Sequence, residues 1–243
     1  MVDEVGFTRL QSFLRPFPDP GDVFADPVER YAWLMDPLVS IELSEVDPEW
    51  VGWIHLVSPV EPIDEYLGTN TCAYASYYTR ENWIGFRLDE SDRYHLLGDW
   101  RIFEAESPDE TVRRNPELVK LYERRHTAYQ ATKSMWHDHG LLVNVDSARR
   151  YGLDWALANP RELIDSLGGD AYPGNWADEQ LFPLEFDENA EADPICCPLT
   201  EDGRRFRFVG AVPNWSYGVD GADSILLFYD PTTRIALETF DYT

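Results

Sequence analysis

The chain has 243 residues, of which 45 are Asp or Glu and 20 are Lys or Arg, so its formal net charge is −25. Apolar residues make up 44% of it and aromatic residues 14%, which excludes a disordered acidic chain and provides for a folded core. The negative charge argues against binding to nucleic acid or to anionic membranes, and no apolar run approaches the roughly 18 residues of a membrane span.

Cysteine usage and the N-terminus both predict a cytoplasmic protein. Met1–Val5 has no basic stretch followed by an apolar one, as a signal peptide would have. The three cysteines, Cys72, Cys196 and Cys197, are odd in number and include a neighbouring pair, which is not typical of a secreted disulfide framework. Only two of the 20 basic residues are lysine, which indicates a GC-rich, bacterial genome or adaptation to salt.

The surplus of acid lies in two stretches that contain no Lys or Arg. Residues 31–79 hold eight acids and residues 162–203 hold twelve, whereas residues 80–161 hold fourteen acids and thirteen basic residues. A field of one sign attracts cationic partners. Charge runs are also commonly solvated faces, so solubility or salt adaptation remains an alternative.

Helix and turn signals organise the first part of the chain. Residues 1–25 form a Pro-rich arm that we expect to be irregular. A short helix is predicted to begin at Asp26, as its cap, and to end by Pro37. Two strands follow over residues 38–46 and 50–58, joined by a turn.

Aromatic and β-branched residues favour strands in the next region. Residues 71–79 and 83–88 are predicted to pair as a hairpin, with Cys72 as a core residue of its first strand. Residues 100–105 are predicted to form a further strand.

A long helix is the strongest local prediction. Asn115 provides a cap, Pro116 suits the first helical position, and Gly140 suits the end of a helix that runs to about His139. Apolar residues at helical spacing are expected to form its buried stripe: Leu118, Leu121, Tyr122, Tyr129, Thr132, Met135 and Trp136.

The remaining elements are short. We expect a strand over 141–145, a helix over 160–167, an irregular acidic segment over about 170–203, a strand over 205–212, and a hairpin of 224–229 with 234–240. The apolar residues in the acidic segment are expected to pack on the domain: Trp176, Leu181, Phe182, Leu184 and Phe186. Together these elements predict one domain, 1–243, of the α+β class, with a mainly antiparallel sheet, one long central helix and a few short helices.

Two regions are predicted to contact a protein partner. Carboxylates gather beside apolar residues over 182–193, and two aromatic residues lie in a loop between strands, where rings often anchor an interface. The predicted contact residues are Glu185, Asp187, Glu188, Glu191, Asp193, Trp215 and Tyr217. The alternative for both regions is that the rings pack inward and the acids only face solvent.

Enzyme signatures are missing from the chain. No Walker loop, Gly-x-Gly-x-x-Gly, Gly-x-Ser-x-Gly or His-Glu-x-x-His motif occurs, and we expect no cofactor. His137 and His139 are the strongest metal-ligand candidates, but two residues apart on a helix their rings diverge by roughly 200°. We therefore expect no metal site, and keep as an alternative an enzyme with an unrecognised, metal-dependent hydrolytic site.

In acidity, size and lack of catalytic motifs the chain resembles the immunity proteins of bacterial toxin systems, including those paired with secreted nucleases. The resemblance is one of overall character and transfers no residue. It implies a cytoplasmic protein that neutralises a basic partner by placing carboxylates where substrate phosphates would bind. A structural module whose acidity serves only solubility is a further alternative.

Overall fold

The computed structural model places six strands in one antiparallel sheet, and it describes residues 6–62, 65–187, 194–218 and 221–242. The strand order is β5-β4-β11-β10-β9-β6. The strands are β4 (Trp83–Leu88), β5 (Tyr94–Leu96), β6 (Ser166–Leu167), β9 (Arg207–Pro213), β10 (Ser224–Asp230) and β11 (Ile235–Asp241). The predicted final strand and hairpin are confirmed, and so is the α+β class with a mainly antiparallel sheet.

Both faces of this main sheet are buried. In β10, Ile225, Leu227 and Tyr229 belong to the main core, whereas Leu226 and Phe228 belong to a second core on the opposite side. Successive side chains of a strand point to opposite faces, so burial on both sides requires the unbroken apolar run seen in the sequence.

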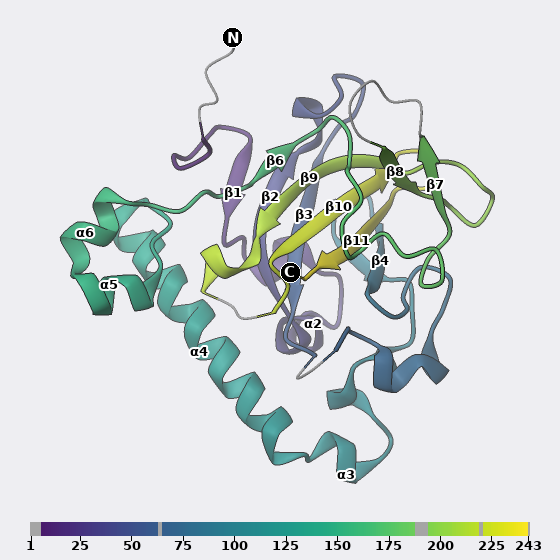
Figure 1. Ribbon diagram of the computed structural model, residues 1–243, viewed down its shortest axis with the longest axis horizontal. Helices are drawn as coiled ribbons and strands as arrows, with labels where there is room; N and C mark the ends of the chain where they lie inside the picture. The colour runs from purple at the N-terminus through teal and green to yellow at the C-terminus, as the bar shows by residue number, and fades with distance from the viewer. Residues whose placement is uncertain (1–5, 63–64, 188–193, 219–220, 243) are drawn as a thin grey trace.

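A second, three-stranded antiparallel sheet packs on the main core. It consists of β1 (Leu14–Pro16), β2 (Met35–Glu42) and β3 (Trp53–Pro59), in the order β1-β2-β3. In Figure 1 its strands β2 and β3 lie behind the green and yellow strands of the main sheet, with β1 at the left. The two predicted strands are present, but β2 begins at Met35 rather than Leu38 and ends before a 3₁₀ turn at Leu43–Glu45.

The long helix α4 (Pro116–His139) has the predicted ends. The Asn115 side chain accepts the N–H of Glu117, and Gly140 adopts the left-handed conformation with φ 64°. The predicted stripe is buried except for Met135, which is half-buried. Arg125 is also buried, and its guanidinium donates to the Ser58 hydroxyl at 3.0 Å and to the Pro59 carbonyl at 2.8 Å. This side of α4 therefore carries both apolar and polar contacts to the end of β3.

Three short α-helices precede α4 among the described residues. They are α1 (Pro20–Val23), α2 (Val28–Leu34) and α3 (Glu110–Arg113). The prediction of an Asp26 cap is wrong, because Pro27 occupies the cap position of α2 and no side chain caps it. The arm predicted to be irregular contains β1 and α1, since Arg15 and its neighbours pair with β2.

The predicted hairpin of 71–79 with 83–88 is wrong. Thr69–Tyr74 is a 3₁₀ segment, and Cys72 is exposed rather than a core residue. β4 pairs instead with β5 and with β11, which follows it by about 150 residues in the chain. A strand-like composition does not specify a partner, and here the partner is distant.

The strand predicted over 100–105 is also wrong. Trp100–Ile102 and Glu104–Glu106 form two 3₁₀ turns. The N–H groups of Glu104 and Ala105 donate to the carboxylate of Glu61, at 2.5 and 2.9 Å. A buried side chain therefore replaces the neighbouring strand that these backbone donors would otherwise need.

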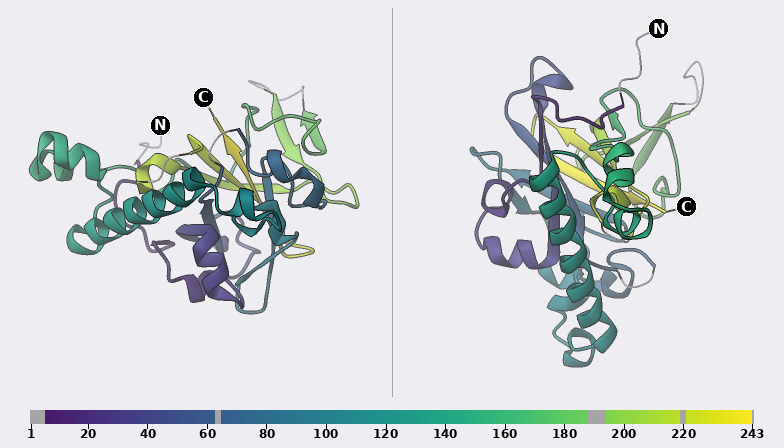
Figure 2. Two further views of the ribbon diagram at one scale, coloured as in Figure 1. Left: turned by 90° about the horizontal axis from the view of Figure 1, so that it is seen from below. Right: turned by 90° about the vertical axis from the view of Figure 1, so that its left-hand side faces the viewer.

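The strand predicted over 141–145 is a connection into two short helices, α5 (Val145–Tyr151) and α6 (Leu153–Ala158). Leu141 and Val143 are buried with Ala156 in a small separate cluster. Figure 2 shows α5 and α6 projecting beyond the end of α4 and away from the sheets.

The helix predicted over 160–167 is wrong. These residues form no helix, and the segment ends in the short strand β6. Its backbone donors bond to three distant segments, because Arg161, Leu163 and Asp165 donate to the carbonyls of Leu142, Phe7 and Ala211. These non-local hydrogen bonds replace the i to i−4 bonds of a helix.

The prediction of an irregular acidic segment over 170–203 is wrong in part, because it contains a hairpin of β7 (Leu184–Asp187) and β8 (Ile195–Pro198). Its predicted inward packing is confirmed, since Trp176, Phe182 and Leu184 are buried in the second core. Within the described residues, no helix is long and apolar enough to cross a membrane.

Candidate functional site

The β7–β8 hairpin has an apolar inner face and an acidic outer face. Leu184 and Cys196 have 8% and 0% of their surfaces exposed, whereas Glu185 is exposed. Beneath the hairpin, Phe182 stacks on Trp83 of β4 with ring centroids 4.4 Å apart. The rings thus pack inward, as in the alternative weighed for this region, and the carboxylates face outward.

Three described carboxylates surround the outer face of this hairpin. Glu185 binds the Arg205 guanidinium through both oxygens, at 2.8 and 2.7 Å, and this bonding lowers the pKa of Glu185. Burial raises the pKa of the Cys197 thiol, with further contributions from the carboxylates of Asp170, Glu185 and Asp187. We call Asp170, Glu185 and Asp187 the hairpin acids. The predicted contact residues Glu188, Glu191 and Asp193 lie outside the described residues.

The start of β9 supplies arginines to both of the acidic stretches that lack Lys and Arg. Arg204 pairs with Asp202, Arg205 with Glu185, and Arg207 with Asp47. Asp202 lies two residues from Arg204 in the sequence, whereas folding brings Glu185 and Asp47 to arginines that are 20 and 160 residues away. With 45 acids against 20 basic residues, most of the surplus negative charge remains.

The two aromatic residues of the second predicted contact region differ in exposure. Trp215 is 44% exposed, and the Arg161 guanidinium lies 4.5 Å from its ring. Tyr217 is fully buried and donates to the Leu163 carbonyl at 2.6 Å, so its prediction as a contact residue is wrong. Arg205 lies just before the start of β9 and Trp215 just after its end. The seven-residue strand therefore separates them by roughly 20 Å. The structure does not bring Trp215 beside the hairpin acids.

His137 and His139 are exposed in the last turn of α4, where two residues of separation directs their rings to different sides. Within the part of the chain that the structure describes, no group of three or more His, Cys, Asp or Glu side chains could hold a metal ion. All three cysteines are free thiols.

The structure contains a buried serine–histidine pair that was not predicted from the sequence. Ser40 of β2 and His55 of β3 are cross-strand partners, and the Ser40 Oγ lies 2.7 Å from His55 Nδ1. His55 Nε2 lies 3.0 Å from the Asp92 carbonyl, which can only accept, so Nε2 carries the proton and Ser40 donates to Nδ1. Only the register of β2 with β3 brings these side chains together, and the sequence does not display that register.

This pair is poorly arranged for nucleophilic catalysis. Burial lowers the pKa of His55 to about 4 and so disfavours the imidazolium that a general base must form. The imidazole instead connects β2, β3 and the loop that holds Asp92.

We expect the imidazole of His55 to titrate near pH 4 in an NMR titration of the folded protein. The unfolded chain binds this proton near pH 6.5, so stability is lost as the pH falls between the two values, by about 3 kcal/mol in all. A titration midpoint above pH 6 would contradict a buried, neutral imidazole.

Glu61 and Glu238 are among the carboxyl side chains that lie buried inside the fold. Glu61 accepts the N–H groups of Glu104 and Ala105 and the hydroxyl of Tyr122, and burial raises its pKa to about 7. Glu238 is fully buried in β11, where burial raises its pKa well above the usual range. Glu238 accepts the N–H of Val57 in β3. The hydrogen bonds of both carboxyl groups join separate elements of the fold, so we assign these groups a structural role.

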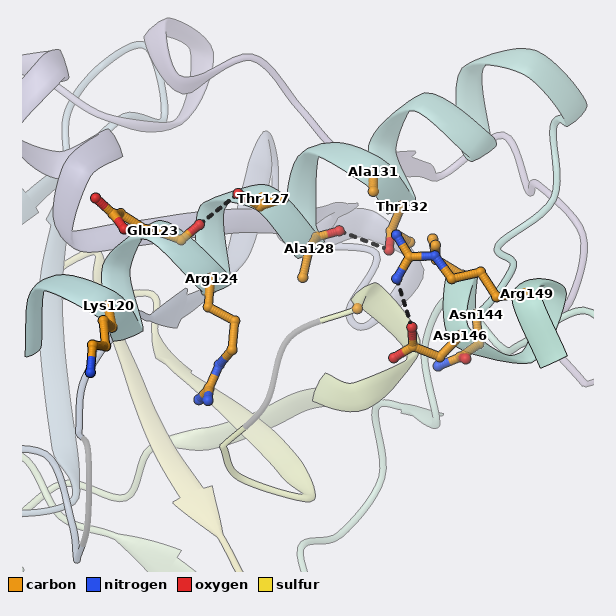
Figure 3. A pocket seen from close by; sticks show the side chains of 12 residues that line it. Lys120, Glu123, Arg124, Thr127, Ala128, Ala131, Thr132, Asn144, Asp146 and Arg149 are labelled. Atoms are coloured by element: carbon orange, nitrogen blue, oxygen red, sulfur yellow. Dashed lines mark hydrogen bonds and ion pairs between the residues drawn. The ribbon is translucent and has the colours of Figure 1, made fainter. Parts of the chain in front are cut away.

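A groove of about 530 Å³ runs between α4 and α5 (Figure 3). Lys120 pairs with Glu117 and Arg149 with Asp146, each within its own helix. These pairs leave little concentrated charge of one sign in the groove, and we assign it no function.

Comparison with known protein families, characterised proteins and solved structures finds no match to this chain.

Proposed function

We propose that this chain is an acidic binding protein that neutralises a basic protein partner, in the manner of a bacterial immunity protein that blocks a toxin. One observation carries the proposal: Glu185 projects outward from a hairpin whose inner face is fixed in the second core. Such a support holds carboxylates in place before binding, which reduces the cost of ordering them at an interface.

The negative charge of the chain favours a cationic partner for this surface. A net charge of −25 accelerates the approach of a cationic partner and repels nucleic acid. On a nuclease, the hairpin acids would occupy positions that substrate phosphates otherwise take. Association would then be fast and sensitive to salt, because exposed charges are screened over about 8–10 Å at physiological salt.

The proposed site of action is the cytoplasm. The three cysteines are free thiols, and vicinal Cys196 and Cys197 lie on one strand of the hairpin without a disulfide. Thiols in this state are typical of a reducing compartment.

The test compares two variants of equal net charge by pull-down from a lysate of the source organism, across a range of salt concentrations. E185Q/D187N removes two hairpin acids, one of which pairs with Arg205. The control D138N/D146N also removes two exposed acids, one of which pairs with Arg149. We expect wild type and control to retain a basic protein at low salt, and the hairpin variant to bind it about tenfold more weakly.

Equal weakening in both variants would attribute retention to net charge alone and would favour the solubility alternative. If wild type retains no basic protein at low salt, the proposal fails.

A further inference from the structure

A cleft separate from the hairpin lies over the three-stranded sheet. Arg15, Ser40 and His55 are successive cross-strand partners in β1, β2 and β3, so their side chains share one face. Trp53, two residues before His55, lies on that same face. The segments 18–22 and 91–93 form the other walls of a cavity of about 490 Å³, a size typical of small-molecule sites.

The orientation of the Arg15 guanidinium suits it to bind an anion. Its guanidinium stacks on Trp53, 3.5 Å from the ring centroid, and its side chain is exposed. It forms no ion pair with any residue that the structure describes, although the chain has 45 acids. Stacking fixes the plane of a guanidinium and leaves its N–H edge available for a carboxylate.

The same cleft offers acceptors for a hydrogen-bond donor. The Ser40 hydroxyl donates to His55, so its oxygen can only accept from a ligand. The Asp22 carboxylate is exposed and also lines the cleft. Asp92 contributes less, because its carboxylate already accepts from Trp53 N–H and pairs with Arg234.

From these groups we infer that the cleft binds a free α-amino acid with an apolar side chain. Arg15 receives the carboxylate, Asp22 and Ser40 accept from the ammonium group, and Pro18 and Trp53 provide apolar surface. A zwitterion has no net charge, so the long-range field of a chain at −25 does not repel it, as it would repel a simple anion.

The test is isothermal titration of the purified chain with L-phenylalanine, and with two analogues that each lack one charged group. These are 3-phenyllactate, which lacks the ammonium, and phenethylamine, which lacks the carboxylate. For a ligand of this size we expect a Kd on the order of 1 mM for phenylalanine and much weaker binding of both analogues.

Paired variants locate the site. R15Q should weaken binding of phenylalanine by about tenfold or more. R207Q is the matched control, because Arg207 also stacks on a tryptophan, Trp50, but pairs with Asp47 and lies outside the cleft. Equal binding by R15Q and wild type, equal loss in R15Q and R207Q, or phenyllactate binding as tightly as phenylalanine would each overturn the inference.

Discussion

Replacing Glu238 by glutamine should remove a fall in stability that the wild-type protein shows as the pH rises. Oε1 of this buried carboxyl accepts the N–H of Val57 in β3 at 3.0 Å, so one side chain joins the two sheets. Its raised pKa means that the folded protein keeps a proton which the unfolded chain releases above about pH 4.5. The wild-type free energy of unfolding therefore falls by about 1.4 kcal/mol per pH unit between the two pKa values.

Urea unfolding of both proteins at a series of pH values measures this effect. E238Q keeps an acceptor for Val57 and cannot ionise, so its stability relative to wild type should increase with pH. The control E238A leaves a buried N–H without this acceptor and opens a cavity, and it should lose about 3 kcal/mol even at acid pH. Parallel pH profiles for E238Q and wild type would show that Glu238 does not change protonation on unfolding.

The position of Glu238 follows from an irregularity in the smaller sheet. The register of β2 with β3 shifts between Pro37 and Val39, and Pro37 is the partner of Val57. The Pro37 carbonyl accepts the hydroxyl of Tyr129 at 2.5 Å, and bulged pairing disturbs the ladder. The carboxyl of Glu238 supplies the Val57 N–H with an acceptor from the other sheet.

Elements with local signals could be predicted from the sequence. The cap at Asn115 and the left-handed Gly140 fix the ends of α4, and both act within a few residues. The C-terminal hairpin has a similar local basis, because the Asp230 carboxylate accepts the N–H groups of Thr232 and Thr233 in the turn. In each case the residues that form the element also specify where it ends.

Elements that depend on distant partners could not be predicted. Residues 71–79 and 100–105 have strand-like composition, but they join no ladder with a neighbouring strand, and 3₁₀ turns form at Thr69–Tyr74, Trp100–Ile102 and Glu104–Glu106. The candidate sites show the same limit. The carboxylates beside apolar residues over 182–193 could be recognised in the sequence, although the strand β7 that directs Glu185 outward was not predicted, whereas the cleft over β1–β3 requires the cross-strand register.

The protonation of Glu61 should give the second large change of stability with pH, and this change has the opposite direction to that of His55. The pKa of Glu61 is about 7 in the folded protein, against 4.5 for an ordinary glutamate. The stability contributed by the bound proton is therefore complete below pH 4.5 and is lost as the pH rises through 7, by about 3 kcal/mol. His55 loses its contribution in the other direction, as the pH falls below 6.5. The two contributions cancel over much of this interval, so single variants are needed to reveal either one.

E61Q should be less stable than wild type at pH 4.5, by about 1–3 kcal/mol, because an amide nitrogen cannot accept from the N–H groups of Glu104 or Ala105. This difference should narrow as the pH rises to 7, because only the wild type loses the contribution of a bound proton. Y122F is the control, since it removes one donor to Glu61 but keeps the carboxyl, and it should still lose stability over this range. A difference between E61Q and wild type that stays constant from pH 4.5 to 7 would mean that Glu61 is ionised in the folded protein throughout, held by its three donors against the cost of burial.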